Sequence, residues 1–327
     1  GEPVHERTGV WMVNLEDPME EAQRRIAAAM KHYNVKPEDI EGRFFVDAGR
    51  DVQIKFATQT REGVVANDEL VEYMSQKISQ HGIGMVFIDP WVGANDINEN
   101  DNVAMNAAVS AARWVCDKTD CAMVLTHHIR KGSGQDDADI NSVRGAGSLI
   151  GAARAARVIN KVPQEDAMKL GLSELEALGI FRVDDGKSNL SPPAAKAVYR
   201  RMEGVDLPNG EWVGVAASFK MPTMFDGVTV QHAQQVQRLV GAAEERQQPM
   251  RASMQAKSWA GHAVAVVLDL DMDKPHQKAR AKAILAKWIE TNVLSVEDFP
   301  DKRAGRDVKI IAVGEWITGK EAGTSTA

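Results

Sequence analysis

The sequence lacks the features that would direct this chain to a membrane or staple it with disulfides. Its 327 residues include only two cysteines, Cys116 and Cys121. These are too few and too close together for a disulfide framework or a four-ligand zinc site. No run of eighteen apolar residues occurs, and residues 1–20 lack the basic-then-apolar order of a signal peptide. We therefore predict a cytoplasmic protein with no membrane partner and with both cysteines reduced.

An excess of positive charge is also missing. The net charge is −7, which argues against a protein that coats nucleic acid over its whole surface. The charge is uneven, because residues 251–327 hold 12 Lys and Arg against 10 Asp and Glu, while the remainder holds 27 against 36. The sequence therefore predicts a weakly basic C-terminal domain on an acidic body.

The first two thirds of the chain alternate strand and helix patterns. Strands are predicted at 10–15, 44–46, 52–57, 85–88 and 123–125, and helices at 19–32, 68–79 and after Asp101, where Val103, Ala107, Val109, Ala112 and Val115 form an apolar face. This order predicts an α/β fold with a mostly parallel sheet covered by helices. A helix at 144–155 and antiparallel strands at 157–160, 180–184 and 197–201 complete a first domain over residues 1–215.

The C-terminal part has a different pattern. Residues 216–250 are rich in Gln, Ala and Glu and are predicted to be a connector with one helix at 231–245. Helices at 256–268 and 278–290, then strands at 293–296 and 308–313 flanking a charged tip, follow the order of a winged-helix domain over 251–317. Residues 318–327 are predicted to be a disordered tail.

Two predicted strands end in a carboxylate. Asp89 ends the apolar run that begins at Gly84, where it could hold Mg²⁺ through water. Glu16 follows the first strand, where it could orient or deprotonate a water molecule. Each has a structural alternative: Asp89 as a turn residue before Pro90, and Glu16 as a charge that complements the dipole of the next helix.

His127 and His128 follow the strand at 123–125. Neighbouring residues of an extended segment point to opposite sides, so only one is expected to face a site there. We predict a phosphate contact or a polar relay and no zinc, with a structural histidine as the alternative. Arg144, Arg154 and Lys187 could be surface charges or cations that stabilise a transferring phosphate.

No Gly-x-x-x-x-Gly-Lys-Ser/Thr phosphate loop occurs in the chain. Gly186-Lys187-Ser188 is not one, because Phe181 stands five positions before Gly186 and no helix follows.

Taken in order, several motifs resemble the RecA-like ATPases of the RepA type, the hexameric replicative helicases of plasmids and prophages. They are Val13-Asn-Leu-Glu-Asp-Pro18, Val86-Phe-Ile-Asp-Pro90, Asn98-Glu-Asn-Asp101, Leu125-Thr-His-His128, Arg144-Gly-Ala-Gly-Ser148 and Gly186-Lys-Ser-Asn-Leu-Ser-Pro-Pro193. The resemblance implies a RecA-like core, a homo-hexameric ring, ATP and Mg²⁺ bound between subunits, single-stranded DNA in the channel and a replication protein as partner.

The resemblance also implies roles for individual residues. Glu16 would be the catalytic glutamate, Asp89 the magnesium-side aspartate and His127 the residue that couples the phosphate to the DNA loop. Arg154 would act on the nucleotide of a neighbouring subunit, with Lys187 as a second cation. The DNA contacts predicted for the core and for the winged-helix tip are Arg130, Lys131, Arg144, Lys302, Arg303 and Arg306.

The absent phosphate loop departs from this family pattern. The chain could be an N-terminally incomplete part of an ATPase, which we expect, or a degenerate subunit, or it could depend on another polypeptide. The leading hypothesis is an ATP-dependent DNA helicase or translocase. A recombination or loading ATPase that does not unwind DNA, and a non-hydrolysing subunit that binds DNA or a partner protein, are the alternatives.

Overall fold

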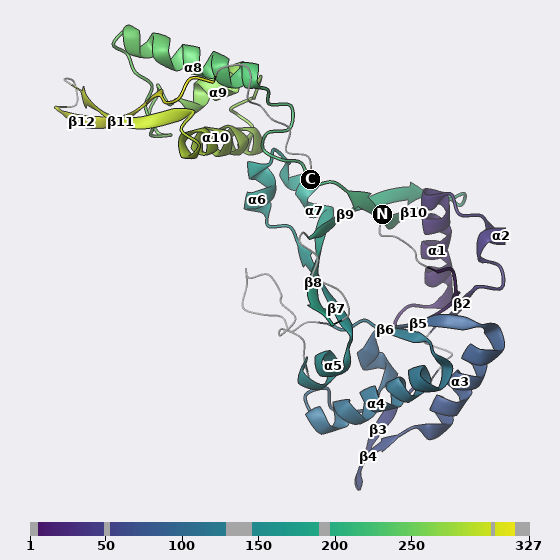
Figure 1. Ribbon diagram of the computed structural model, residues 1–327. Helices are drawn as coiled ribbons and strands as arrows, with labels where there is room; N and C mark the ends of the chain where they lie inside the picture. The colour runs from purple at the N-terminus through teal and green to yellow at the C-terminus, as the bar shows by residue number, and fades with distance from the viewer. Residues whose placement is uncertain (1–5, 49–52, 129–145, 190–196, 302–304, 318–327) are drawn as a thin grey trace. The chain divides into compact units, whose positions relative to one another are not determined.

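The computed structural model describes residues 6–48, 53–128, 146–189, 197–301 and 305–317, and Figure 1 shows its helices and strands. The chain folds into two compact units. One contains residues 1–161 and 181–219, and the other contains residues 162–180 and 220–327. The chain therefore leaves the first unit at residue 162, returns to it at 181 and leaves it again at 220.

A parallel four-stranded sheet forms the centre of the first unit, with the strand order β2-β1-β5-β6. The strands are β1 (Gly9–Asn14), β2 (Phe44–Ala48), β5 (Ile83–Asp89) and β6 (Ala122–Leu125). Their side chains are mostly apolar, as expected for parallel strands with both faces covered. This confirms the predicted α/β fold with a parallel sheet.

The helices of this sheet begin and end at residues that fit those positions. They are α1 (Met19–Tyr33), α2 (Pro37–Ile40), α3 (Asp68–His81) and α4 (Asn102–Thr119). The Asn67 side chain accepts a hydrogen bond from the Leu70 amide at 3.0 Å, and Asp101 accepts from the first amides of α4. Gly82 and Asp120 end α3 and α4 in the left-handed conformation. These local signals explain why the predicted bounds agree closely with the observed ones.

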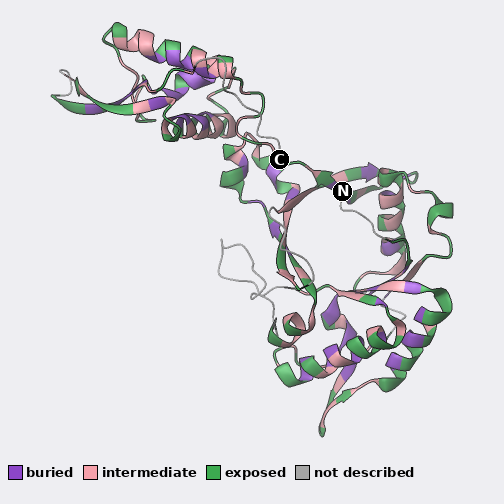
Figure 2. Cartoon of the chain, viewed as in Figure 1, coloured by how far each residue is buried: buried purple, intermediate pink, exposed green. Residues whose placement is uncertain are grey.

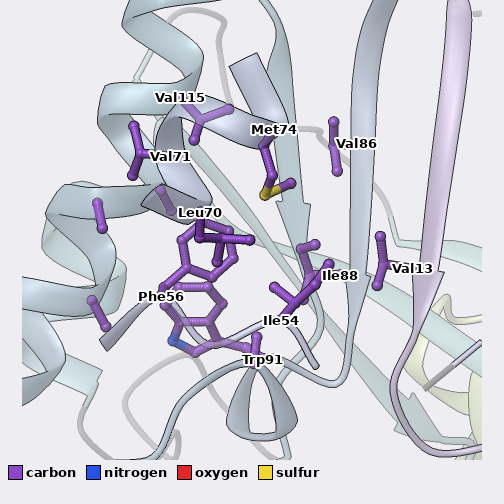
Figure 3. Packing of buried hydrophobic residues seen from close by; sticks show 14 of the residues in the cluster. Val13, Ile54, Phe56, Leu70, Val71, Met74, Val86, Ile88, Trp91 and Val115 are labelled. Atoms are coloured by element: carbon purple, nitrogen blue, oxygen red, sulfur yellow. The ribbon is translucent and has the colours of Figure 1, made fainter. Parts of the chain in front are cut away.

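The main core lies between this sheet and helices α3 and α4 (Figure 3). Trp91, in the short 3₁₀ helix η1 (Trp91–Ala94), is fully buried against Phe56, with 5.3 Å between the ring centroids. The Trp91 indole N–H points to the sulfur of Met105 at 3.2 Å. This packing fixes the chain that directly follows Asp89.

The predicted apolar face of α4 is partly wrong. Val103 is 77% exposed, and the buried face consists instead of Ala104, Met105, Ala108, Val109, Ala111, Ala112 and Val115. At about 100° per residue, Val103 lies roughly half a turn away from the middle of that face. Its apolar side chain is therefore directed to solvent.

The strand predicted at 52–57 is also wrong. Residues 53–56 form no strand, and the hairpin of β3 (Ala57–Thr60) and β4 (Gly63–Ala66) follows them. Ile54 and Phe56 alternate with polar neighbours because both side chains enter the core, and no strand ladder is involved. A sequence repeat of two residues does not distinguish a β-strand from an irregular segment that buries every second side chain.

An antiparallel sheet with the order β10-β9-β8-β7 completes the first unit. It contains β7 (Ala155–Lys161), β8 (Ile180–Ser188), β9 (Val198–Asp206) and β10 (Trp212–Phe219). Helix α1 packs on β9 and β10 through Ala28, which contacts the cluster of Val205 and Val215. The predicted antiparallel strands are confirmed, while the helix predicted at 144–155 is described only over α5 (Ala146–Ala152).

The second unit consists of helices and one hairpin. Its elements are α6 (Gln164–Lys169), α7 (Glu174–Leu178), α8 (Val230–Glu245), α9 (Gly261–Val267), α10 (Pro275–Glu290), β11 (Leu294–Asp301) and β12 (Arg306–Val313). Its core includes Val236, Val264, Ile284, Trp288 and Ile311, and Figure 2 shows the buried positions along α8 to α10. The two later helices and the hairpin follow the predicted order, although α9 is shorter than predicted.

The predicted connector over residues 216–250 needs correction. Residues 212–219 are the edge strand β10 of the first unit, and α8 buries Ala233, Val236 and Val240 in the core of the second. The Gln- and Ala-rich composition of this segment did not indicate a core helix, because the buried face of α8 consists of only a few side chains. The sequence also did not predict that residues 162–180, which lie between two segments of the first unit, belong to the second unit.

None of the described helices is long and apolar enough to cross a membrane. Cys116 and Cys121 are both free thiols.

Candidate functional site

The carboxyl ends of β1, β5 and β6 lie side by side and are tied together by backbone hydrogen bonds. Asn14 at the end of β1 is in register with Asp89 at the end of β5. The Leu15 amide donates to the Asp89 carbonyl at 2.7 Å, and the Thr126 amide donates to the Ile88 carbonyl at 3.0 Å. The polar groups that follow these three strands therefore share one edge of the sheet, where ligands bind in open α/β sheets.

Asp89 makes a specific side-chain contact at this edge. The Thr126 hydroxyl donates a hydrogen bond to its Oδ1 atom. The Trp91 amide donates to the Thr126 carbonyl at 2.8 Å, which fixes the backbone on both sides of the pair. Thr126 had no predicted role. Its signal was available, because Thr126 is the first polar residue after the apolar run of β6.

Glu16 lies in the turn after β1. Its side chain is exposed, and no hydrogen bond or ion pair to it occurs within the part of the chain that the structure describes. The turn is shaped by Asn14, whose buried side-chain oxygen accepts hydrogen bonds from the Glu16 and Asp17 amides, both at 2.9 Å. Asp17 is engaged differently, since Arg25 donates to its carboxylate at 2.7 Å. Of the two acids, Glu16 is the one directed to solvent without a partner.

His127 and His128 differ in their surroundings. His127 is half-buried and His128 is exposed. The Nδ1 atom of His127 donates to the His128 carbonyl at 2.8 Å, an assignment that makes Nε2 the acceptor of a neutral ring. That Nε2 atom is buried and has no partner among the described residues. A buried nitrogen without a partner is unusual and indicates a place for a polar ligand or a water molecule.

The donor set fits a hydrated magnesium ion better than a directly bound metal. Among the described residues, no group of three or more His, Cys, Asp or Glu side chains is arranged to hold an ion. One carboxylate and one hydroxyl at a strand end match Mg²⁺, which keeps several of its waters and uses few protein ligands. The side chains at this edge are acidic or neutral: Asp89, Thr126 and Glu16. They suit a metal ion and a water molecule. The binding of a negatively charged phosphate needs further groups.

Lys187 has a structural partner. It lies within β8, and its ammonium donates to the carbonyls of Ile150 at 2.6 Å and Gly151 at 3.2 Å, at the carboxyl end of α5. A cation at that position satisfies free carbonyls and complements the helix dipole. Arg154 is exposed just before β7 and makes no ion pair with described residues. The structure does not bring either cation together with Asp89 through a contact.

The remaining predicted residues divide into two groups. Arg130, Lys131, Arg144, Lys302 and Arg303, and the tail 318–327, lie outside the described residues. Arg306 begins β12, where it is exposed and in register with Asp301.

Comparison with known proteins finds a similarity to a known domain family in the first part of the chain. Residues 1–134 match the family model of an AAA domain. A search of curated protein sequences gives no match. Among solved structures, a KaiC-like protein from the hyperthermophilic archaeon Pyrococcus horikoshii OT3 is similar with a TM-score of 0.37 and 13% identity, over 65% of this chain and 76% of that one. The matched segment 1–134 contains Glu16, Asp89, Thr126 and His127.

Proposed function

We propose that this chain is part of an ATP-dependent motor that acts on DNA. The observation that carries the proposal is the shared edge at which Asp89 and Thr126 are hydrogen-bonded while Glu16 has no partner among the described residues. A match to an AAA domain over the same residues supports ATP as the nucleotide.

The chain's own residues have separate tasks in this proposal. Asp89 and Thr126 would hold a magnesium ion, and the ion would supply positive charge that neutralises the transferring phosphate. Glu16 accepts a hydrogen bond from the attacking water, for which an exposed and unpaired carboxylate is suited. His127 responds to the nucleotide through its Nε2 atom, which has no hydrogen-bond partner in the described parts of the structure.

The phosphate-binding loop comes, in this proposal, from a polypeptide segment outside these 327 residues. The strand β6 supports this, because among the described residues it pairs only with β5 and its other edge is free to accept a strand. The first measurement is the gene sequence upstream of the codon for Gly1. An in-frame strand followed by Gly-x-x-x-x-Gly-Lys-Ser/Thr supports the proposal, whereas a start codon at that point contradicts hydrolysis within one chain.

Point mutations in the protein encoded by the complete gene then test the site. Glu16→Gln is expected to lower kcat of ATP hydrolysis by about 10²-fold or more while ATP binding is kept, since it removes the group that positions the water. Asp89→Asn is expected to weaken the dependence on Mg²⁺. Glu72→Gln is the matched control, because Glu72 is an exposed acid of the same unit that pairs with Lys118 at 2.8 Å. Unchanged hydrolysis in Glu16→Gln would contradict the role of this edge.

The finer assignment is a helicase or translocase of a plasmid or prophage replication system, active as a homo-hexamer on single-stranded DNA, with Arg154 acting on the neighbouring subunit's nucleotide. Arg154 supports this, because it is exposed and makes no ion pair within the described part of the chain, as expected for a cation that acts in another subunit. Unwinding of a forked duplex tests it. Hydrolysis without unwinding would favour a recombination or loading ATPase.

A further inference from the structure

The two cysteines of the chain meet where α4 ends and β6 begins. Cys116 lies in the last turn of α4, and Cys121 directly precedes β6. Cys121 is 7% exposed and belongs to the main core, and the half-buried Cys116 packs against the same core. The sequence contains only these two thiols, so both of them occupy a single turn.

The backbone of this turn brings the two residues together. Asp120 ends α4 in the left-handed conformation with a φ of 56°, and its amide donates to the Cys116 carbonyl at 2.8 Å. In a helix end of this type the chain folds back over the last helical turn. The residue after the left-handed one then commonly contacts the residue whose carbonyl is bonded. Cys121 therefore lies beside Cys116 although five positions separate them.

The two thiols are in direct contact and differ in acidity. The Cys116 thiol donates a hydrogen bond to the Cys121 sulfur, which lowers the pKa of the Cys121 thiol to about 6 and raises the pKa of the Cys116 thiol. Burial raises the pKa of both thiols, as do the charges of Asp117 on Cys116 and of Asp120 on Cys121. At neutral pH the pair thus holds a thiolate beside a protonated thiol. Ordinary buried cysteines are inert because their thiols stay protonated.

The pair lies close to the surface at the end of α4. Asp117, Lys118 and Asp120 are exposed, and the Cys116 side chain is partly accessible. Cys121 is largely covered, so a small oxidant reaches its sulfur more readily than a bulky disulfide does. Hydrogen peroxide is the smallest member of the hydroperoxide class, and it reacts with thiolates.

We propose that Cys116 and Cys121 form a redox-active dithiol that a small hydroperoxide oxidises to an intrachain disulfide. The Cys121 thiolate attacks one peroxide oxygen, so that an S–O bond forms and the O–O bond breaks. The hydroxide that leaves takes up the proton that Cys121 had released, which gives water and a sulfenic acid.

The second step closes the disulfide. The Cys116 sulfur attacks the Cys121 sulfur, the S–S bond forms and the S–O bond breaks. The hydroxyl group leaves with the Cys116 proton as a second water molecule. The two thiols together supply the two electrons that reduce the peroxide.

The disulfide joins the end of α4 to the start of β6. The other end of β6 leads to Thr126, which donates to Asp89 in the candidate site. Oxidation therefore acts on a strand that leads into that site. Neither step involves a nucleotide, so the inference stands or fails separately from the proposed ATPase function.

The test is oxidation of the reduced full chain with hydrogen peroxide at pH 6, followed by N-ethylmaleimide and digestion with trypsin. Cleavage after Arg113, Lys118 and Arg130 separates the two cysteines. Mass spectrometry is expected to find peptide 114–118 linked to peptide 119–130 by a disulfide, without the maleimide label. A non-reducing gel should show that the protein stays a single chain.

The single variants assign the two roles. Cys116→Ser is expected to stop at a sulfenic acid on Cys121, which dimedone traps. Cys121→Ser is expected to give about tenfold less trapped product, because its remaining thiol stays protonated. Equal trapping in the two variants would overturn the assignment of Cys121 as the nucleophile.

Wild type in urea is the control for the folded geometry and needs no variant to fold. At pH 6 the folded chain is expected to form the linked peptides about tenfold faster, because an ordinary thiol with a pKa of about 8.5 is almost wholly protonated there. Equal rates in the folded and unfolded chains would overturn the inference. Two thiols that remain free for maleimide after peroxide treatment, or disulfides that form only between chains, would overturn it as well.

Discussion

At the residue scale, Gln237 is a fully buried polar side chain whose amide nitrogen and oxygen both make hydrogen bonds. Its amide nitrogen donates to the carbonyls of Val293 at 2.8 Å and Glu315 at 2.7 Å, and its oxygen accepts from the Ile317 amide at 3.2 Å. Three backbone groups near the end of the described chain are thus satisfied by one side chain in α8. A buried network of this kind specifies one arrangement of the segments that it joins.

Gln237→Leu is expected to destabilise the second unit by about 2–4 kcal/mol, because it leaves buried backbone groups without partners. Urea unfolding followed by circular dichroism measures the change. Gln235→Leu is a control on the same helix, at a position where the structure shows no such network. Equal midpoints for the Gln237 variant and wild type would contradict the role of the network.

Glu244 is a second informative residue, because burial raises the pKa of its carboxyl above the ordinary value, and the nearby charge of Glu297 raises it further. A carboxylate with a raised folded-state pKa binds its proton more tightly in the folded protein. It therefore stabilises the fold at a pH below its unfolded pKa, and this contribution is lost as the pH rises through the folded pKa.

Glu244→Gln is expected to raise the Tm at pH 7 slightly, by about 1–2 °C, because solvent screens much of the effect at this partly exposed carboxyl. The difference should vanish near pH 4, where Glu244 is itself protonated. Calorimetry at both pH values checks the sign. A larger gain at pH 4 than at pH 7 would refute the raised pKa.

At the scale of elements, the turn between β1 and α1 shows how a buried side chain determines the position of an exposed one. Asn14 is only 2% exposed and holds the amides of Glu16 and Asp17. The ion pair of Arg25 with Asp17 joins the same turn to the first turns of α1. The orientation of Glu16 is therefore a property of the whole turn.

Asn14→Ala is expected to lower the stability of the first unit by about 1–3 kcal/mol, since two amides lose a buried acceptor. Asn14→Asp keeps an acceptor for both amides but loses the donor that faces the Asp17 carboxylate at 3.2 Å. The aspartate variant should therefore be more stable below pH 4 than at pH 7, relative to wild type. Unfolding curves at the two pH values distinguish the variants, and identical behaviour of both would contradict this geometry.

At the scale of the whole molecule, each of the two units has a main hydrophobic core of its own. The core of the first unit includes Met74, and that of the second includes Ile284. Residues 162–180 belong to the second unit although they interrupt an antiparallel hairpin of the first. Each core buries its own apolar side chains, so each unit has its own free energy of unfolding.

We therefore expect two transitions in scanning calorimetry. Met74→Ala should lower one Tm and Ile284→Ala the other, each by roughly 10 °C for a loss of about 3 kcal/mol. The two variants are matched, because each deletes a fully buried aliphatic side chain. A single transition that shifts equally in both variants would show that the units unfold together.

The sequence by itself determined the local features of this protein. Helix caps such as Asn67 and Asp101, the left-handed Gly82, and the apolar runs that end at Asn14 and Asp89 act over a few residues, so the chain states them directly. They were sufficient for the parallel α/β order and for the prediction that Asp89 and Glu16 each lie at the end of a strand.

Only the tertiary structure decided which distant groups meet. Thr126 becomes a partner of Asp89 because β5 and β6 are adjacent, and Lys187 becomes the partner of the end of α5. The assignment of α8 and residues 162–180 to the second unit likewise depends on packing. Hydrophobic burial depends on the area removed from water and not on sequence separation, so local patterns cannot specify which surfaces come together.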